Sequence, residues 1–110
     1  MNILKQEERK AYAVKCTAEE GGKIVGRAYL YVIFNDLHEE PYGLLEDVFV
    51  NEEFRGKGVG GELVRAVVEE AKARGCHKLI CTSRHGKEDI HAWYKSFGFV
   101  DHGVEFRMDF

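Results

Sequence analysis

Glycine and basic residues are concentrated at positions 55–61, where the sequence is Arg-Gly-Lys-Gly-Val-Gly-Gly. Apolar residues at helical spacing within 63–71 predict a helix directly after this segment. The first turn of a helix carries unpaired backbone N–H groups and the positive end of the helix dipole, and glycines let an anion approach the backbone. Arg55 and Lys57 add positive charge, and an arginine can bind two phosphate oxygens at once. The segment is therefore predicted to bind a phosphate group.

Two carboxylates, Glu46 and Asp47, stand inside the apolar run at 44–50 that precedes the glycine segment. The run is rich in β-branched and aromatic residues, which predicts a mostly buried strand. A carboxylate on this strand could accept a proton from a substrate, but strand neighbours point to opposite faces, so only one would face a given site unless a bulge intervenes. Exposure, or pairing with an arginine, explains either carboxylate equally well. The sequence leaves open which of the two has a catalytic role.

The segment Gly56–Gly61 also matches the G-x-G-x-x-G fingerprint of dinucleotide-binding domains. That fingerprint follows its strand directly and is answered about 20 residues later by an acidic residue. Here four residues intervene, and the next apolar run ends in Thr82 and Ser83. Because Arg84 could bind a 2′-phosphate, an NADP-binding domain stays as a third alternative.

The remaining segments predict the elements that would position these residues. Two apolar runs, 11–17 and 24–34, flank Glu-Glu-Gly-Gly-Lys and predict a β-hairpin. The apolar run at 77–83 predicts a strand parallel to 44–50, since a helix connects the two. A short helix is expected over 87–97, ended by Gly98, with one or two further strands in 99–110. Together these elements predict an α/β domain.

Composition limits the class of protein. A chain of 110 residues is large enough for one domain, and its formal charge of −3 argues against a protein that binds nucleic acid by neutralising phosphates. No apolar run approaches the roughly 18 residues of a membrane span and no signal-peptide pattern occurs, so we expect no membrane association and a cytoplasmic location. The three cysteines, Cys16, Cys76 and Cys81, lack Cys-x-x-Cys spacing and are expected to be free thiols, and no metal site is predicted.

Two motifs resemble those of one enzyme family. Arg55, Gly58 and Gly60, after a strand that ends Val-x-Val, resemble motif A of the GNAT superfamily of acetyl-CoA-dependent N-acetyltransferases. The segment 92–99, Ala-Trp-Tyr-Lys-Ser-Phe-Gly-Phe, resembles the family's aromatic-Tyr-x-x-x-Gly-Phe ending. The resemblance covers 44–110. It implies an α/β (α+β) fold with a mixed, mostly antiparallel central sheet, a splayed pair of parallel strands and flanking helices.

The resemblance also implies a reaction and its residues. Acetyl would pass directly from acetyl-CoA to a primary amine of a small molecule in a ternary complex. Tyr94 occupies the position of the family's general acid and would protonate the thiolate, while Glu46 or Asp47 would relay the amine proton. Lys87 stands where many members have an asparagine that contacts the coenzyme, and could meet a phosphate. The residues expected to bind the coenzyme are Val48, Phe49, Val50, Arg55, Gly56, Lys57, Gly58, Val59, Gly60 and Lys87.

Within the family, the run from Glu46 to Lys57 and the segment from Gly98 to Glu105 resemble the glucosamine-6-phosphate N-acetyltransferases. An amino sugar phosphate is therefore one candidate acceptor. Compared with that group, residues 1–110 are expected to form a single domain without the usual first strand and two helices. The alternating pattern at 104–110 predicts a last strand covered by a second copy, hence a homodimer. The main alternative is a non-catalytic acyl-CoA-binding or regulatory module.

Overall fold

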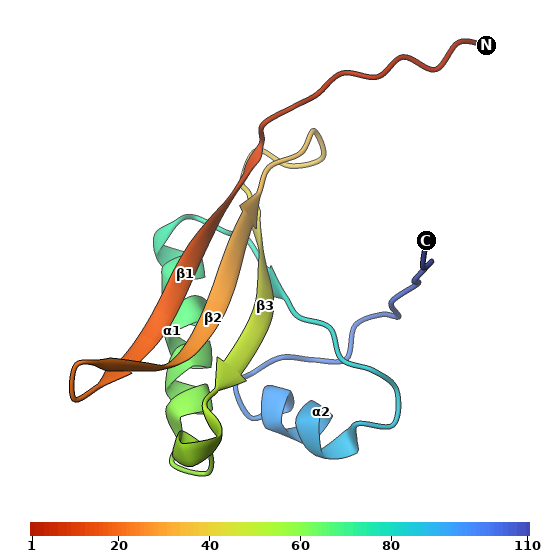
Figure 1. Cartoon of the computed structure of the whole chain (residues 1–110). Helices are drawn as coiled ribbons and strands as arrows, with labels where there is room; N and C mark the ends of the chain where they lie inside the picture. Colours follow the sequence, from red (N-terminus) through yellow and green to blue (C-terminus); the bar gives the residue numbers. More distant parts are fainter. The chain divides into compact units, whose positions relative to one another are not determined.

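The computed structural model describes all residues from 1 to 110. The chain divides into two compact units, Met1–Ile80 and Cys81–Phe110, and each is described by itself. The first unit contains the strands β1 (Ala11–Glu20), β2 (Lys23–Ile33), β3 (Tyr42–Val50) and β4 (Leu79–Ile80), the short 3₁₀ helix η1 (Glu52–Phe54) and the helix α1 (Val59–Ala73) (Figure 1). The second unit contains the helix α2 (Glu88–Lys95).

The four strands form one mixed sheet in the order β1-β2-β3-β4, which confirms the predicted fold class. The hairpin predicted between β1 and β2 is present, and β2 also pairs antiparallel with β3. The parallel pairing of β3 with β4 is limited to Gly43 with Leu79 and Leu44 with Ile80. β3 continues to Val50 without a strand partner on that side.

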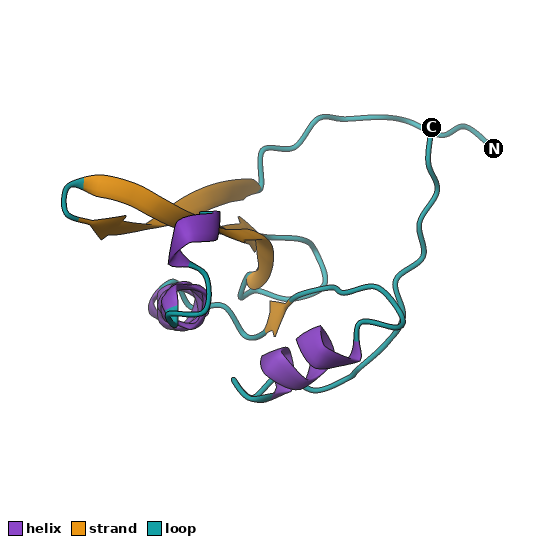
Figure 2. Cartoon of the chain, turned by 60° about the horizontal axis from the view of Figure 1, so that its bottom comes forward, coloured by secondary structure: helices purple, strands orange, loops and turns teal.

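The core of the first unit lies between the sheet and α1, which packs along one face of the sheet (Figure 2). Strand side chains alternate between faces and helical side chains recur every three to four residues, so each element buries one stripe. The buried stripes consist of Ala28, Leu30 and Val32 of β2 and Leu63, Val64, Val67 and Ala71 of α1. After α1 the N–H of Gly75 donates to the carbonyl of Lys72 over 3.1 Å, and its φ of +78° is that of a left-handed glycine cap.

The first turns of α1 lie close to the sheet because β2 has a glycine beneath them. A Cβ at Gly26 would lie 3.0 Å from the carbonyl oxygen of Phe49 and 3.1 Å from Cδ1 of Leu63. Backbone atoms cannot give way as the tip of a flexible side chain can. The size of residue 26 therefore limits how near the start of α1 can come to β3.

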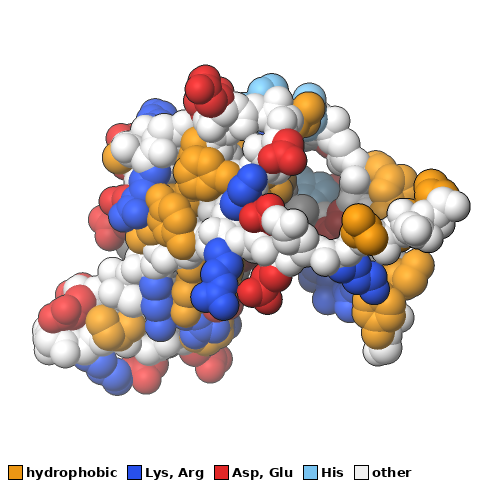
Figure 3. Space-filling view, turned by 90° about the horizontal axis from the view of Figure 1, so that it is seen from above, with side chains coloured by type: hydrophobic (Ala, Val, Ile, Leu, Met, Phe, Trp, Pro, Cys, Tyr) orange, Lys and Arg blue, Asp and Glu red, His pale blue; other side chains and the backbone are white.

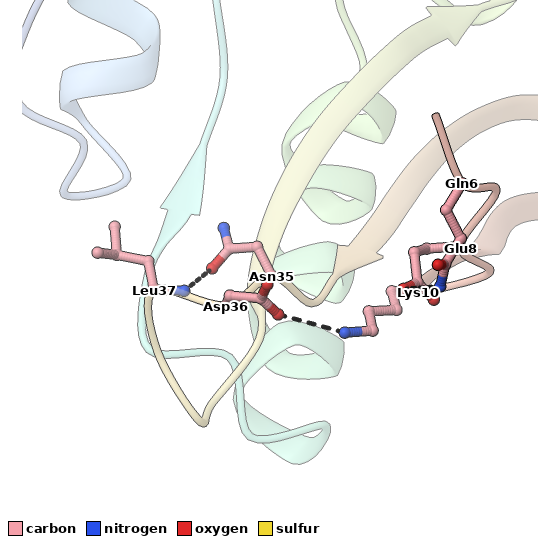
Figure 4. A network of polar contacts seen from close by, with 6 residues as sticks. All are labelled: Gln6, Glu8, Lys10, Asn35, Asp36 and Leu37. Carbon is pink, nitrogen blue, oxygen red and sulfur yellow. Dashed lines mark hydrogen bonds and ion pairs between the residues drawn. The ribbon is translucent and has the colours of Figure 1, made fainter. Parts of the chain in front are cut away.

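The residues before β1 are joined to the loop after β2 (Figure 4). Lys10 Nζ lies 3.3 Å from Asp36 Oδ1, and the N–H of Phe34 donates to the carbonyl of Lys10 over 2.8 Å. Within that loop the N–H of Leu37 donates to Asn35 Oδ1 over 2.9 Å, the side-chain-to-backbone bond of an Asx turn. These contacts fix the end of the hairpin that lies opposite the Gly21-Gly22 turn.

The strand predictions in the last third of the chain are partly wrong. The strand expected over 77–83 forms only at Leu79–Ile80, and residues 99–110 form no strand. Alternation of apolar and polar residues gives a strand only where another strand supplies hydrogen-bond partners. Without such a strand, the apolar side chains of 104–110 are exposed, with exposed fractions of 62% for Val104, 91% for Phe106, 76% for Met108 and 113% for Phe110. The short helix expected within 87–97 is confirmed.

Candidate functional site

A β-bulge interrupts β3 at the two predicted carboxylates. The pairing of β2 with β3 shifts register between Arg27 and Tyr29, so that Asp47 and Val48 together lie opposite Ala28. Asp47 has a φ of +54° and is the only non-glycine residue with a positive φ. Two residues opposite one, with a local break in the ladder, define a bulge. The alternation of strand side chains is therefore broken at Asp47, which is the exception that the sequence left open for this strand.

The bulge brings both carboxylates to the sheet face opposite α1, which we call the open face. Glu46 pairs with Tyr29, whose side chain lies on this face, and Asp47 reaches Arg27 on the same face. Glu46 and Asp47 are both exposed. They line one open depression of about 400 Å³, together with Ala11, Tyr31, Ile33 and Leu44.

Asp47 is bound by an arginine from the neighbouring strand. Arg27 donates from Nε to Oδ2 over 2.8 Å and from Nη2 to Oδ1 over 3.1 Å, which is a two-point contact. The hydrogen bonds from Arg27 lower the pKa of the Asp47 carboxyl below its ordinary value. Asp47 is therefore a weak proton acceptor, whereas the side-chain carboxylate of Glu46 makes no hydrogen bond or ion pair. Of the two carboxylates that the sequence could not separate, only that of Asp47 is held by an arginine.

The predicted phosphate segment forms an uncapped helix N-terminus. Gly58 is the N-cap of α1, with a φ of +85° that side chains with a Cβ rarely adopt, and no side chain caps this end. The first helical bond runs from the N–H of Glu62 to the carbonyl of Gly58 over 3.1 Å. The N–H groups before Glu62 consequently have no partner within the helix. Since Gly58 is exposed and Val59 and Gly60 are partly exposed, an anion can reach these groups.

Two positive side chains lie at this helix N-terminus on aromatic rings. Arg55 donates from Nε to the carbonyl of Val50 over 2.9 Å, and its guanidinium carbon lies 5.5 Å from the centre of the Phe49 ring. Lys57 Nζ lies 5.3 Å from the centre of the Phe54 ring. Basic side chains also lie beside hydrophobic ones on the face of the molecule that Figure 3 shows. The rings and the carbonyl hold the two charges next to the glycine segment.

The guanidinium of Arg27 also lies on the Phe49 ring, 4.7 Å from its centre. Arg27 therefore contacts both Asp47 and Phe49, and Phe49 in turn contacts Arg55. Sequence reasoning missed Arg27. The only indication in the sequence was the position of Arg27 on the outward face of the predicted hairpin. This position does not show which residue of β3 it contacts, because the pairing register of β2 with β3 depends on the bulge.

The unpaired part of β3 contains three of the residues expected to bind the coenzyme. Past Leu44 the strand has no strand partner on the β4 side. The backbone groups that point to that side therefore make no ladder hydrogen bonds, and the Val50 carbonyl accepts from Arg55 instead. Val48, Phe49 and Val50 belong to this part of β3, which leads through η1 to Arg55 and the glycine segment.

Tyr94 and Lys87 belong to the second unit, whereas the other predicted site residues belong to the first. The half-buried Tyr94 lies in α2, with its ring centre 5.2 Å from that of Trp93 and 5.7 Å from that of Phe99. Lys87 is the exposed N-cap residue of α2. The aromatic packing fixes the Tyr94 ring within its own unit.

The cysteines do not provide an activated nucleophile. All three are free thiols, and burial raises the pKa of Cys81 to about 11. Burial also raises the pKa of Cys16 and of Cys76. A thiol needs a lowered pKa to attack a substrate at neutral pH.

The structure has no helix that is both long and apolar enough to span a bilayer.

Comparison with known proteins gives consistent matches. A family model described as "Acetyltransferase (GNAT) family" matches residues 2–99. A protein of Oryza sativa subsp. japonica described as "Probable glucosamine 6-phosphate N-acetyltransferase 2" is 41% identical over 70 residues, which are 62% of this chain and 39% of the rice protein. The matched part of this chain thus spans about two fifths of that relative.

Two longer matches extend over most of the chain. The glucosamine 6-phosphate N-acetyltransferase of Trypanosoma brucei brucei is 30% identical over 110 residues, which are 98% of this chain and 73% of that protein. The crystal structure of glucosamine-6-phosphate N-acetyltransferase from Arabidopsis thaliana superposes with a TM-score of 0.79 at 27% identity, and the match covers 89% of this chain and 67% of that one.

Proposed function

This chain belongs to the GNAT acetyltransferase family, and from that membership we propose that it transfers an acetyl group from acetyl-CoA to a primary amine of a small molecule. One observation carries the proposal: an uncapped helix N-terminus at Gly58 lies next to Arg55 and is connected through η1 to a bulged strand that has no strand partner on one side. This arrangement offers donors for a pyrophosphate and for the amides of an extended thioester arm.

In the proposed complex, the backbone N–H groups at Gly58, Val59 and Gly60 hold the pyrophosphate of acetyl-CoA, with Arg55 and Lys57 supplying charge. Gly56 lets the loop turn towards the helix, since its φ is +75°. The backbone of Val48–Val50 pairs with pantetheine, and Lys87 contributes a further positive charge to a phosphate.

In the proposed reaction, the amine nitrogen attacks the thioester carbonyl, an N–C bond forms, and the C–S bond breaks. Only a neutral amine can attack, and an alkyl amine with a pKa of about 10.4 is almost entirely protonated at pH 7. Glu46 relays the amine proton, because its carboxylate is exposed on the open face while Arg27 binds that of Asp47. Tyr94 donates its phenolic proton to the departing thiolate.

The acceptor class is proposed from the relatives. The rice, trypanosome and Arabidopsis proteins all have names that include glucosamine 6-phosphate N-acetyltransferase. An amino sugar phosphate is therefore the first acceptor to test, ahead of amino sugars without phosphate and simple alkyl amines.

The experiment measures release of free thiol from acetyl-CoA across a panel of amines, with calorimetry of acetyl-CoA and NADPH binding in parallel. We expect acetyl-CoA binding and amine-dependent thiol release. Binding of acetyl-CoA without release for any amine would instead favour a non-catalytic acyl-CoA-binding module, and binding of NADPH alone would favour a dinucleotide-binding domain.

We also propose a homodimer. Four apolar side chains in 104–110 are 62–113% exposed, and a second copy would bury them on a shared surface.

A further inference from the structure

We propose that Arg27 is a positioning residue that holds the β3 bulge in place, and that Asp47 serves through its backbone conformation and its bond to Arg27, not as a proton acceptor. The inference rests on the proposed function, because the bulge matters only if β3 binds the acetyl-CoA arm. It adds a role for Arg27 and removes Asp47 from the candidates for the catalytic base.

The first step of the argument is the backbone of Asp47. A φ of +54° places this residue in the left-handed region, where the Cβ of an L-residue crowds the following carbonyl. Aspartate tolerates this region better than most residues but does not prefer it. The conformation therefore persists only if neighbouring groups hold it.

The second step is the shape of the contact with Arg27. A guanidinium is a rigid planar fork, and two parallel bonds to one carboxylate fix both position and orientation. Arg27 makes such bonds to Asp47 at 2.8 and 3.1 Å and also lies 4.7 Å from the centre of the Phe49 ring. Asp47 and Phe49 stand on either side of Val48. One side chain from β2 therefore joins both ends of the bulge.

The third step links the bulge to the phosphate segment. The Phe49 ring that Arg27 contacts lies 5.5 Å from the guanidinium carbon of Arg55. Arg55 is in turn bound to the carbonyl of Val50 over 2.9 Å. If the bulge relaxed into a regular strand, the residues after it would exchange faces, and both the Phe49 ring and the Val50 carbonyl would move away from Arg55.

A second arginine provides a matched control. Arg74 donates from Nε to Glu70 over 2.9 Å and lies 5.4 Å from the centre of the Tyr12 ring, and its side chain is 39% exposed, the same fraction as that of Arg27. Glu70 lies in a regular helix and has no positive φ. Replacement of Arg74 thus removes the same kind of contact without touching a bulge.

The test uses the full chain and five variants: Arg27→Met, Asp47→Gly, Asp47→Val, the double variant Arg27→Met/Asp47→Gly, and Arg74→Met. Acetyl-CoA affinity and kcat are measured for each, after circular dichroism has shown that it is folded. We expect Arg27→Met to lower kcat by about 10²-fold through misplaced backbone groups, and Asp47→Val to do the same. Glycine adopts a positive φ without support, so we expect Asp47→Gly to keep kcat within about threefold of the native value.

The double variant separates the proposal from simple loss of a charge. If Arg27 acts by holding residue 47, adding Arg27→Met to Asp47→Gly should cost at most about twofold more, because the glycine no longer needs the arginine. Arg74→Met should leave kcat and acetyl-CoA affinity unchanged. An Asp47→Gly variant as inactive as Arg27→Met, a fully additive double variant, or equal effects of Arg27→Met and Arg74→Met would each overturn the proposal.

A measurement that does not depend on enzyme activity separates this test from the test of the proposed function. Backbone chemical shifts of residues 46–49 report the bulge directly, and we expect Arg27→Met to move them towards regular strand values while Asp47→Gly preserves the bulge. Unchanged shifts in Arg27→Met would overturn the proposal whether or not the native protein transfers acetyl. If Arg27→Met does not fold, Arg27→Lys takes its place, because it keeps the charge and loses only the fork. Failure of the native protein to bind acetyl-CoA would refute the proposed function alone.

Discussion

Gly26 of β2 leaves no room for a side chain between itself and Phe49 of β3, since a Cβ would lie 3.0 Å from the Phe49 carbonyl oxygen. The same Cβ would lie 3.4 Å from Cγ1 of Val59, the first residue of α1. Gly26 therefore lies at the point where β3, the strand before the glycine segment, meets α1, the helix after it.

The first prediction is that Gly26→Ala moves the start of α1 away from the sheet. Forcing an extra carbon into packed surroundings costs about 1–3 kcal/mol. We expect a lower free energy of unfolding in denaturant titrations and weaker acetyl-CoA binding in calorimetry. Gly103→Ala is the control, since a Cβ there meets nothing within 4 Å. Equal stability and affinity in the two variants would show that the packing under α1 adapts freely.

The second prediction concerns the phosphate segment. Arg55→Ala should weaken acetyl-CoA binding about tenfold or more, because a charge-assisted contact to the pyrophosphate is lost. Binding of acetyl-pantetheine, which has no pyrophosphate, should not change. Lys72→Ala removes a positive charge from the last turn of α1 and should affect neither ligand. If Arg55→Ala weakened the binding of acetyl-CoA and of acetyl-pantetheine equally, Arg55 would act by supporting β3 and not by contacting the pyrophosphate.

The third prediction is a pH dependence of stability from the Asp47 carboxyl. Because hydrogen bonds from Arg27 lower its pKa, the folded state favours the ionised form. That contribution is present at neutral pH and is lost as the pH falls from about 3.9, the ordinary value for aspartate, through the lower value in the folded state. Asp47→Asn should therefore flatten the decline of the free energy of unfolding below about pH 4.

The control for this pH dependence is Asp36→Asn. Asp36 pairs with Lys10 at 3.3 Å, but its side chain is 97% exposed, and exposed pairs contribute little. A decline below pH 4 that is the same in native protein and Asp47→Asn would contradict the assigned role of the Arg27 pair.

The sequence predicted most of the first unit because local signals determine it. The hairpin, the strand before the glycine segment and the helix after it each have a periodic pattern and a turn or cap of their own. The last strands failed for the opposite reason, since the pattern in 104–110 gives no information about the strand that would pair with it.

The bulge and Arg27 could not be predicted from local pattern. Neither position 47 nor position 48 is a glycine that would suggest a positive φ, and the contact that holds Asp47 comes from a residue 20 positions earlier. Only the register between β2 and β3 brings these side chains together. The sequence could therefore identify both carboxylates but could not assign either a role.

The fourth prediction tests the proposed acid. Tyr94→Phe keeps the ring contacts with Trp93 and Phe99 and deletes only the hydroxyl. A general acid should then lose about 10²–10⁴-fold in turnover with little change in acetyl-CoA affinity. Tyr42→Phe, at the start of β3, is the control and should be neutral. Native turnover in Tyr94→Phe would reduce Tyr94 to a packing residue.

The last prediction concerns assembly. Phe106 is 91% exposed, in a segment where Val104, Met108 and Phe110 are also exposed, and a shared surface between two copies would remove these side chains from water. We expect light scattering to give twice the chain mass of 12.6 kDa at micromolar concentration. Phe106→Asp should shift the particle to the monomer mass, because the new carboxylate would be buried without a partner. Gly103→Asp adds the same charge at a position where a side chain meets nothing within 4 Å, and should leave the dimer intact. A native particle of 12.6 kDa would refute the dimer, whereas dissociation of both variants would show that added charge alone, and not the Phe106 side chain, controls association.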